Sequence, residues 1–374
     1  MASLKLLSQD ELRRNCPFKW HKDIPENGIS LGVADIDFTG PAGINEYIKS
    51  QLIDGYAFYQ KQSGLDSAID SVVDYLSQFN ANISHNSIQI TPGTMIGIYS
   101  AMKFISKKEG HILSVGPIYG PIHYHATDNG NELRWININH NGLDIDELTN
   151  SITRETKMIS ICNPLNPVGH VFTESEIKAI SQICVDYNTI CFSDELYAPL
   201  VFKGKHSSIL QFDDLLDRSI SLFGFSKAYG LAGYRSGFLH AGTAIIDGLK
   251  DIVNHQLVSP SPVASIVCKY ALTSPEVKSW VGVFRKQIHS NTEVASKRFR
   301  ESGFDCFTPE GGLFVFPNIG VDDIEFKEKC LRETGVQVIE GVEFGPMGKN
   351  HIRINCGTSQ ERLMEAIERI ISIL

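Results

Sequence analysis

The residue with the clearest chemical potential is Lys227, which stands among small residues in the run Ser226–Arg235 (SKAYGLAGYR). The run follows Ser219–Phe223, an apolar stretch that is typical of a buried strand. Partial burial lowers the pKa of a lysine and frees its amine to attack a carbonyl and form an imine. Arg235, eight residues later, could return to the same place and hold a phosphate. For a lone lysine, a glycine-rich surface loop is the commoner explanation, but the complete string is more specific.

Three further motifs place polar groups where a predicted strand ends or a predicted helix begins. Ser193–Tyr197 (SDELY) puts an acid and a tyrosine after an apolar strand. Asn163–Gly169 (NPLNPVG) is a turn signal. Thr91–Met95 (TPGTM) opens a helix, whose first backbone amides and dipole suit a phosphate. Taken singly, each has a common structural explanation: a helix N-cap acid, a turn, and an ordinary helix start.

Two tyrosines and an arginine stand outside these motifs. Tyr119 closes the run Pro-Ile-Tyr, and Tyr59 precedes Gly64 by five residues. Arg353 lies in the apolar run His351–Asn355 (HIRIN), and an arginine there could hold a carboxylate in a bidentate fork. For either tyrosine alone, packing into the core is an equally good explanation.

In this order, the motifs resemble those of the class I/II aminotransferase family of fold-type-I enzymes that depend on pyridoxal phosphate (PLP). The resemblance runs from about residue 28 to the end of the chain. It implies that Lys227 holds the cofactor as a Schiff base and, once displaced, removes the Cα proton of an amino acid. It implies that Asp194 keeps the pyridine nitrogen protonated, which makes the ring an electron sink. Tyr197 and Asn166 would bind the ring oxygen, and Asn166 would also reach the substrate carboxylate.

The same resemblance assigns the remaining contacts. Tyr119 would stack on the pyridine ring, and Tyr59 would reach the phosphate of the neighbouring subunit, which implies a homodimer with shared sites. Arg353 would clamp the α-carboxylate of a free amino acid. The expected phosphate ligands are Gly93, Thr94, Met95, Ser226 and Arg235.

Several positions depart from the family pattern. Gly224 stands where the family usually has Ser or Thr, so that one phosphate contact is missing unless Ser226 replaces it. Val33–Phe38 and Lys203–His206 look more like the C–S lyases of the cystathionine β-lyase type, although those lyases tend to carry His at the position of Tyr197.

The acids Glu11 and Asp35 map to segments that line the substrate entrance in this fold, where they would favour a cationic side chain. Solvated surface acids are the alternative explanation. We therefore expect elimination or dehydration, with or without cyclisation of a hydroxylated, arginine-like substrate, as in capreomycidine or enduracididine formation. An amino acid aminotransferase and a C–S β-lyase are the alternatives, because all three reactions begin with loss of the same Cα proton.

The elements that must position these residues alternate between short strands and helices. Strands are expected near 87–91, 111–115, 157–162, 189–193, 219–223 and 236–240, and helices near 42–54, 64–80, 94–106 and 174–187. The alternation predicts an α/β fold of fold type I. A large domain, 45–262, would carry a mostly parallel seven-stranded sheet covered by helices, and 1–44 with 263–374 would form a smaller α/β domain. Such sheets bind ligands at the carboxyl ends of their strands, where the polar motifs fall.

Composition narrows the class of protein further. The 374 residues carry a formal net charge of −9 and no long basic run, which argues against a nucleic-acid surface and against a basic DNA-binding domain attached to a PLP sensor. We expect no membrane contact and a cytoplasmic location, because no apolar stretch has the length of a membrane span and the start is not a secretory signal. The eight cysteines are scattered without a CxxC pair, which predicts buried thiols and no metal site.

Overall fold

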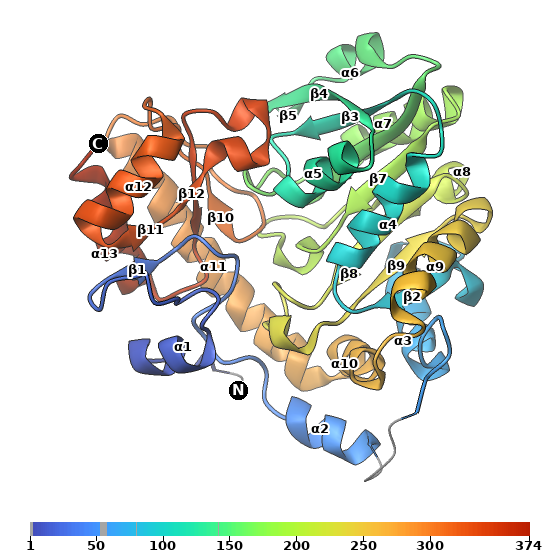
Figure 1. Cartoon of the computed structure of the whole chain (residues 1–374), viewed down its shortest axis with the longest axis horizontal. Coiled ribbons are helices and arrows are strands. Elements are labelled where there is room, and N and C mark those ends of the chain that lie inside the picture. The colour runs from blue at the N-terminus through green and yellow to red at the C-terminus, as the bar shows by residue number, and fades with distance from the viewer. Residues whose placement is uncertain (1–2, 53–57, 80, 141) are drawn as a thin grey trace.

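The computed structural model describes residues 3–52, 58–79, 81–140 and 142–374 (Figure 1). Its largest sheet is built from β2 (Ile88–Thr91), β3 (His111–Gly116), β4 (Glu132–Asn139), β5 (Gly142–Leu143), β6 (Thr156–Cys162), β7 (Ile190–Asp194), β8 (Ser219–Gly224) and β9 (Gly237–Ala241). Within the described residues the strand order is β2-β9-β8-β7-β6-β3-β4-β5. Strands β8, β7, β6, β3 and β4 are mutually parallel, whereas β9 is antiparallel to both of its neighbours. The predicted, mostly parallel sheet is therefore present, with the two-residue strand β5 as an eighth member.

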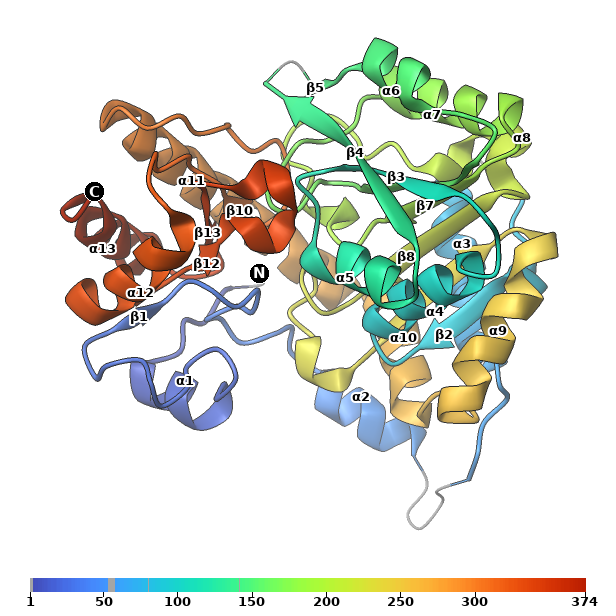
Figure 2. The ribbon, with the colours of Figure 1, turned by 45° about the horizontal axis from the view of Figure 1, so that its top comes forward.

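Helices cover both faces of this sheet (Figure 2). One face carries α4 (Met95–Ile105), α5 (Gly120–Asp128) and α9 (Thr243–Leu257), and the other carries α3 (Asp66–Leu76), α7 (Glu174–Asp186), α8 (Asp213–Leu216) and α10 (Pro262–Thr273). The predicted helices 64–80, 94–106 and 174–187 appear as α3, α4 and α7. The N-terminus of α7 is fixed by a capping box between Thr173 and Glu176.

Six elements of the large sheet region do not follow from the sequence patterns: β4, β5, α5, α6 (Ile145–Ser151), α8 and α9. Strand β4 shows why. It alternates from Glu132 to Trp135, but the alternation slips at Ile136, so that the buried positions change phase. Because a strand is recognised by a period of two, this slip weakens the signal.

A smaller unit gathers around β13 (Ile352–Asn355), which pairs antiparallel with β10 (Phe314–Val315) and β12 (Ile339–Glu340). The chain's beginning joins this unit, because β1 (Ile29–Ser30) pairs in parallel with β11 (Val336–Gln337). Its helices are α1 (Gln9–Asn15), α12 (Asp323–Thr334), α13 (Gln360–Ile371) and part of α11 (Pro275–Glu301), while α2 (Ile44–Gln51) leads into the large unit. In Figure 1 the blue N-terminal segment lies beside the red C-terminal elements.

Two clusters of buried apolar side chains correspond to the two units. The larger cluster includes the large sheet, α10 and α11 as far as Ile288, and the smaller one begins on α11 at Ala295. Packing therefore changes from one core to the other inside α11, whereas the domain boundary predicted at 262/263 stays a prediction. Of the helices in the described ranges, none combines the length and apolarity needed to cross a membrane.

Candidate active site

One edge of the large sheet collects the polar residues that the sequence singles out. Strands β2 and β8 are both antiparallel to β9, so β2 runs in the same direction as the parallel strands. Their carboxyl ends therefore meet at one edge. The residues that follow or end these strands are Gly93, Thr94 and Met95 after β2, Tyr119 after β3, Asn166 after β6, Asp194 on β7, and Ser226 and Lys227 after β8.

Lys227 lies between the two units and is only partly exposed. Its Nζ donates a hydrogen bond to the backbone carbonyl of Ala34, which belongs to the N-terminal segment. Burial lowers the pKa of Lys227 to about 8, Asp35 opposes this shift, and the nearby Arg353 and Arg235 add to it. Near pH 8 a large share of the amine is therefore unprotonated, as attack on an aldehyde requires.

Asp194 is buried at the end of β7, and its Oδ1 accepts a hydrogen bond of 3.2 Å from the backbone N–H of Leu196. Burial raises the pKa of this carboxyl to about 7, Glu195 raises it further, and the positive charge of Lys227 lowers it. A carboxylate that is this costly to ionise is stabilised by a nearby cation. A protonated pyridine nitrogen would provide that cation.

The turn before α4 forms a cradle for an anion. Gly93 has φ +84, and a Cβ added there would lie only 2.6 Å from Nη2 of Arg235. The guanidinium of Arg235 therefore covers this turn, and its Nη1 is held by the carbonyl of Ala232 at 3.0 Å. The free amides at the start of α4 and an arginine in contact with the same turn fit a phosphate group. Ser226, which directly precedes Lys227, is 8% exposed.

The structure gives a steric reason for Gly224. A Cβ added at this position would lie 2.7 Å from Cδ1 of Leu196 and 2.9 Å from Cγ2 of Thr94. The space for a serine or threonine side chain is thus taken by two neighbours. Thr94, the N-cap residue of α4, carries a hydroxyl of the kind that Gly224 lacks.

Arg353 joins three distant parts of the chain. It is 5% exposed, its Nη2 donates to the carbonyl of Gly32 at 2.9 Å, and its Nη1 donates to Oδ1 of Asn166 at 3.2 Å. Its guanidinium carbon lies 4.2 Å from the ring centre of Phe314 and 4.9 Å from that of Phe344. The Nε atom is buried without a partner among the described residues. This leaves hydrogen-bonding capacity for a carboxylate.

Two tyrosines, Tyr119 and Tyr197, also lie at this edge of the large sheet. The hydroxyl of Tyr119 lies 3.7 Å from the sulfur of Met95, at the start of α4. Tyr197 is buried and packs edge-to-face against Phe314, with ring centres 5.7 Å apart. Burial raises the pKa of both tyrosines, whereas the charge of Arg353 lowers it in each. Both phenols therefore stay protonated and can donate a hydrogen bond.

Of three further predicted site residues, Asp35, Glu11 and Tyr59, the structure places only Asp35 beside Lys227. Asp35 lies beside Lys227, and its Oδ1 accepts from the backbone N–H of Ile36 at 2.9 Å. Glu11 instead caps α1, where Oε2 accepts from the N–H and the hydroxyl of Ser8 at 2.9 Å each. Tyr59 is 83% exposed in the single chain. Glu11 and Tyr59 thus show no contact with the site, and their predicted roles stay predictions.

Sequence patterns did not identify the backbone carbonyls of Gly32 and Ala34 or the rings of Phe314 and Phe344. A backbone carbonyl has no residue type that marks it, and a phenylalanine in an apolar run looks like an ordinary core residue. These contacts follow from the approach of the N-terminal segment and β13 to the sheet edge.

Comparison with known proteins agrees with this geometry. Residues 26–370 match the model of the family described as "Aminotransferase class I and II". The chain is 30% identical to aromatic-amino-acid aminotransferase 2 of Thermococcus litoralis over 93% of this chain and 92% of the relative. It is also 30% identical to the aspartate aminotransferase of Pyrococcus abyssi, over 92% and 91%. The crystal structure of an aromatic aminotransferase from Pyrococcus horikoshii matches with a TM-score of 0.88 and 27% identity, covering 94% of this chain and 96% of that one.

Proposed function

Because the chain belongs to the class I and II aminotransferase family of PLP-dependent enzymes, we propose that it is an amino acid aminotransferase. One observation carries the proposal: Asp194 ends β7, Lys227 follows the adjacent strand β8, and each shifts the pKa of the other. The relatives support transamination over the elimination or dehydration predicted from the sequence, because those reported above are named as aminotransferases.

The residues at the sheet edge fit PLP. When bound, PLP supplies an aldehyde that condenses with an amine and a ring that withdraws electrons from the substrate Cα. We assign the phosphate to the cradle of Gly93, Thr94 and Met95 with Arg235 and Ser226. Tyr119 would cover the ring, and Asn166 and Tyr197 would bind the ring oxygen.

The chain's own groups account for the movement of the proton. Arg353 and Asn166 hold the α-carboxylate and so fix the direction of the Cα–H bond. The Nζ of Lys227 takes that proton, because its lowered pKa makes the free amine available near neutral pH. For transamination, Nζ must deliver this proton to a carbon other than the substrate Cα from which it was taken. Asp194, as a carboxylate, would pair with the protonated ring nitrogen of PLP.

Asp35 supports a proposal about the substrate side chain. Its charge acts on Lys227, and it belongs to the segment whose carbonyls contact Lys227 and Arg353. A negative charge at this place repels a substrate whose side chain is a second carboxylate. We therefore expect neutral or cationic amino donors to be preferred over acidic ones.

The homodimer and the cytoplasmic location also belong to this proposal. The exposed ring of Tyr59 supports the dimer, since a large aromatic side chain that is 83% exposed is a typical interface residue. Sedimentation analysis of the purified protein would distinguish a dimer from a monomer.

A donor panel with an added keto acid tests the function. The PLP-loaded protein is incubated with single amino acids and phenylpyruvate, an acceptor with an uncharged side chain, and product masses are measured. Transamination predicts the keto acid of the donor together with phenylalanine. Release of ammonia, loss of water with retained nitrogen, or release of a thiol, each without phenylalanine, would instead support the elimination, cyclase or lyase alternatives.

A further inference from the structure

Glu195 is a buried carboxylate that the proposed function does not use. It directly follows Asp194 and is 1% exposed. Its backbone N–H donates to the carbonyl of Leu222 at 2.8 Å, which extends the pairing of β7 with β8. Its side chain accepts a hydrogen bond from Oγ of Ser208 at 3.0 Å and lies 2.6 Å from Nε2 of His206. Both partners, His206 and Ser208, lie in the segment that follows Tyr197 in the chain.

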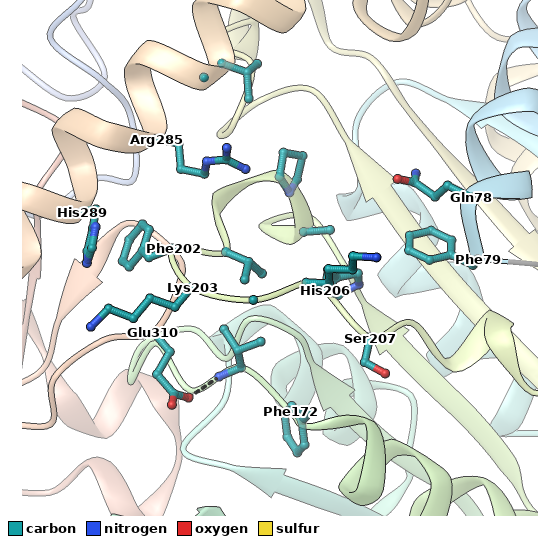
Figure 3. Close-up of a pocket in the computed structure, with 18 of the residues that line it drawn as sticks. Gln78, Phe79, Phe172, Phe202, Lys203, His206, Ser207, Arg285, His289 and Glu310 are labelled. Atoms are coloured by element: carbon teal, nitrogen blue, oxygen red, sulfur yellow. Dashed lines mark hydrogen bonds between the residues drawn. The ribbon is translucent and has the colours of Figure 1, made fainter.

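His206 is held firmly in this pairing. Its side chain is 7% exposed, and its ring packs edge-to-face against Phe79 at 5.8 Å between centres. Ser208 is fixed as well, because its hydroxyl accepts from the N–H of Leu210 at 3.2 Å. His206 lies in the wall of a cavity of about 1270 Å³, which also borders Phe79 and Ser207 (Figure 3). The pair is thus buried between this cavity and the sheet edge.

The charges explain why Glu195 needs a partner. Two carboxyls at successive positions in a buried strand end disfavour each other's ionisation, and Glu195 does raise the pKa of Asp194. The other groups in the described residues whose pKa values respond to Glu195 are Tyr75, Cys162 and Cys191, and a phenol or thiol brings no positive charge. The imidazole of His206, whose Nε2 lies 2.6 Å from Oε2 of Glu195, is a side chain that can carry a positive charge.

We propose that His206 is a positioning residue that, by pairing with the buried Glu195, keeps Asp194 ionised and so sets the affinity of the site for PLP. The pair of His206 and Glu195 affects the cofactor through the ionisation of Asp194. The contacts of Glu195 with His206 and Ser208 also hold the segment from Asp194 to Tyr197 in place. The inference rests on cofactor binding and on the assigned role of Asp194, and it is independent of whether the reaction is transamination.

Titration of the apoprotein with PLP tests the inference without turnover. His206→Asn leaves Glu195 without its imidazole partner, and we expect the dissociation constant of PLP to rise at least tenfold. Glu195→Gln removes the charge but keeps a side chain of the same shape, and we expect a change of less than threefold. In the double variant, adding His206→Asn to Glu195→Gln should raise the dissociation constant of PLP by less than a further threefold. The reason is that Glu195→Gln leaves no buried charge unpaired at this position.

A second buried carboxylate–histidine pair provides the matched control. His170 lies 3.2 Å from Glu176, with side chains 7% and 11% exposed. His170→Asn should lower thermal stability but change the PLP dissociation constant less than twofold. The inference is overturned if His206→Asn binds PLP like the wild type, or if the double variant is as weak as His206→Asn. It is also overturned if His170→Asn weakens binding equally. Should His206→Asn fail to fold, the double variant decides: it must fold and bind PLP within threefold of Glu195→Gln.

Discussion

The edge of the large sheet and the region around Arg353 are assembled in different ways. The cofactor residues at the sheet edge follow successive strands between positions 91 and 235, and the hydrogen-bonded ladder fixes their spacing. Around Arg353, by contrast, contacts join residues as far as 321 positions apart, and two separate cores must meet. The first region performs chemistry that a whole family can share. The second depends on how two units approach each other, and this is where we expect the choice of substrate to lie.

The largest effect is expected at the sheet edge. Lys227→Ala removes the amine that takes the Cα proton, and kcat/KM should fall about 10⁴-fold for every amino donor. Steady-state rates measured across the donor panel would show this. Exchange of the Cα proton in deuterated solvent at the wild-type rate would contradict the role of Lys227.

A smaller and more selective loss is expected in the second region. Arg353→Lys keeps the charge but loses the fork that binds a carboxylate, and KM should rise by about 100-fold with a weaker effect on kcat. The measurement is a full kinetic profile with one donor. If kcat falls and KM stays constant, Arg353 does not hold the substrate carboxylate.

Asp194→Asn should separate stability from function at the sheet edge. The folded-state pKa of about 7 lies above the ordinary 3.8, so the folded apoprotein binds more protons than the unfolded chain between these values. The contribution of Asp194 to stability therefore falls as pH rises from about 4 to 7. Asn removes this cost, and we expect the apoprotein to gain on the order of 2 kcal/mol at pH 8 while it loses PLP-dependent activity. Urea unfolding at pH 5 and pH 8 measures it, and an equal gain at both pH values would contradict the assignment.

Asp35→Asn should change selectivity more than rate. Removal of this charge relieves repulsion of acidic donors, and the ratio of kcat/KM for glutamate over arginine should rise about tenfold, or about 1.4 kcal/mol. The same change removes a charge that raises the pKa of Lys227, so the acidic limb of the pH–rate profile, where activity rises as Lys227 loses its proton, should move to lower pH. If the ratio does not change, Asp35 does not determine the selectivity between acidic and cationic donors.

The smallest effect is expected at Glu11, which caps α1. Glu11→Ala should lower the thermal stability slightly and leave the kinetics of all donors unchanged. Thermal unfolding and the donor panel together test this. A selective loss of activity toward cationic donors would support the substrate role that the sequence predicts for Glu11.

The sequence could predict the sheet edge because each residue there belongs to a short motif beside a recognisable strand or helix. Asp194 and Lys227 end or follow apolar runs, and Thr173 marks the start of a helix, which the structure has as a capping box. Strand β4 was missed because its alternation slips at Ile136. Around Arg353, the carbonyl of Gly32 and the ring of Phe314 could not be predicted, since neither has a local pattern that indicates contact with a residue hundreds of positions away.

The assignment of Lys227 as the amine that binds the cofactor beside Asp194 can be checked without any assay of turnover. The PLP-loaded protein is reduced with borohydride, digested with a protease and examined by mass spectrometry. We expect one modified peptide, with the reduced cofactor attached to Lys227. Attachment to a different lysine, or recovery of Lys227 unmodified from fully loaded protein, would contradict it.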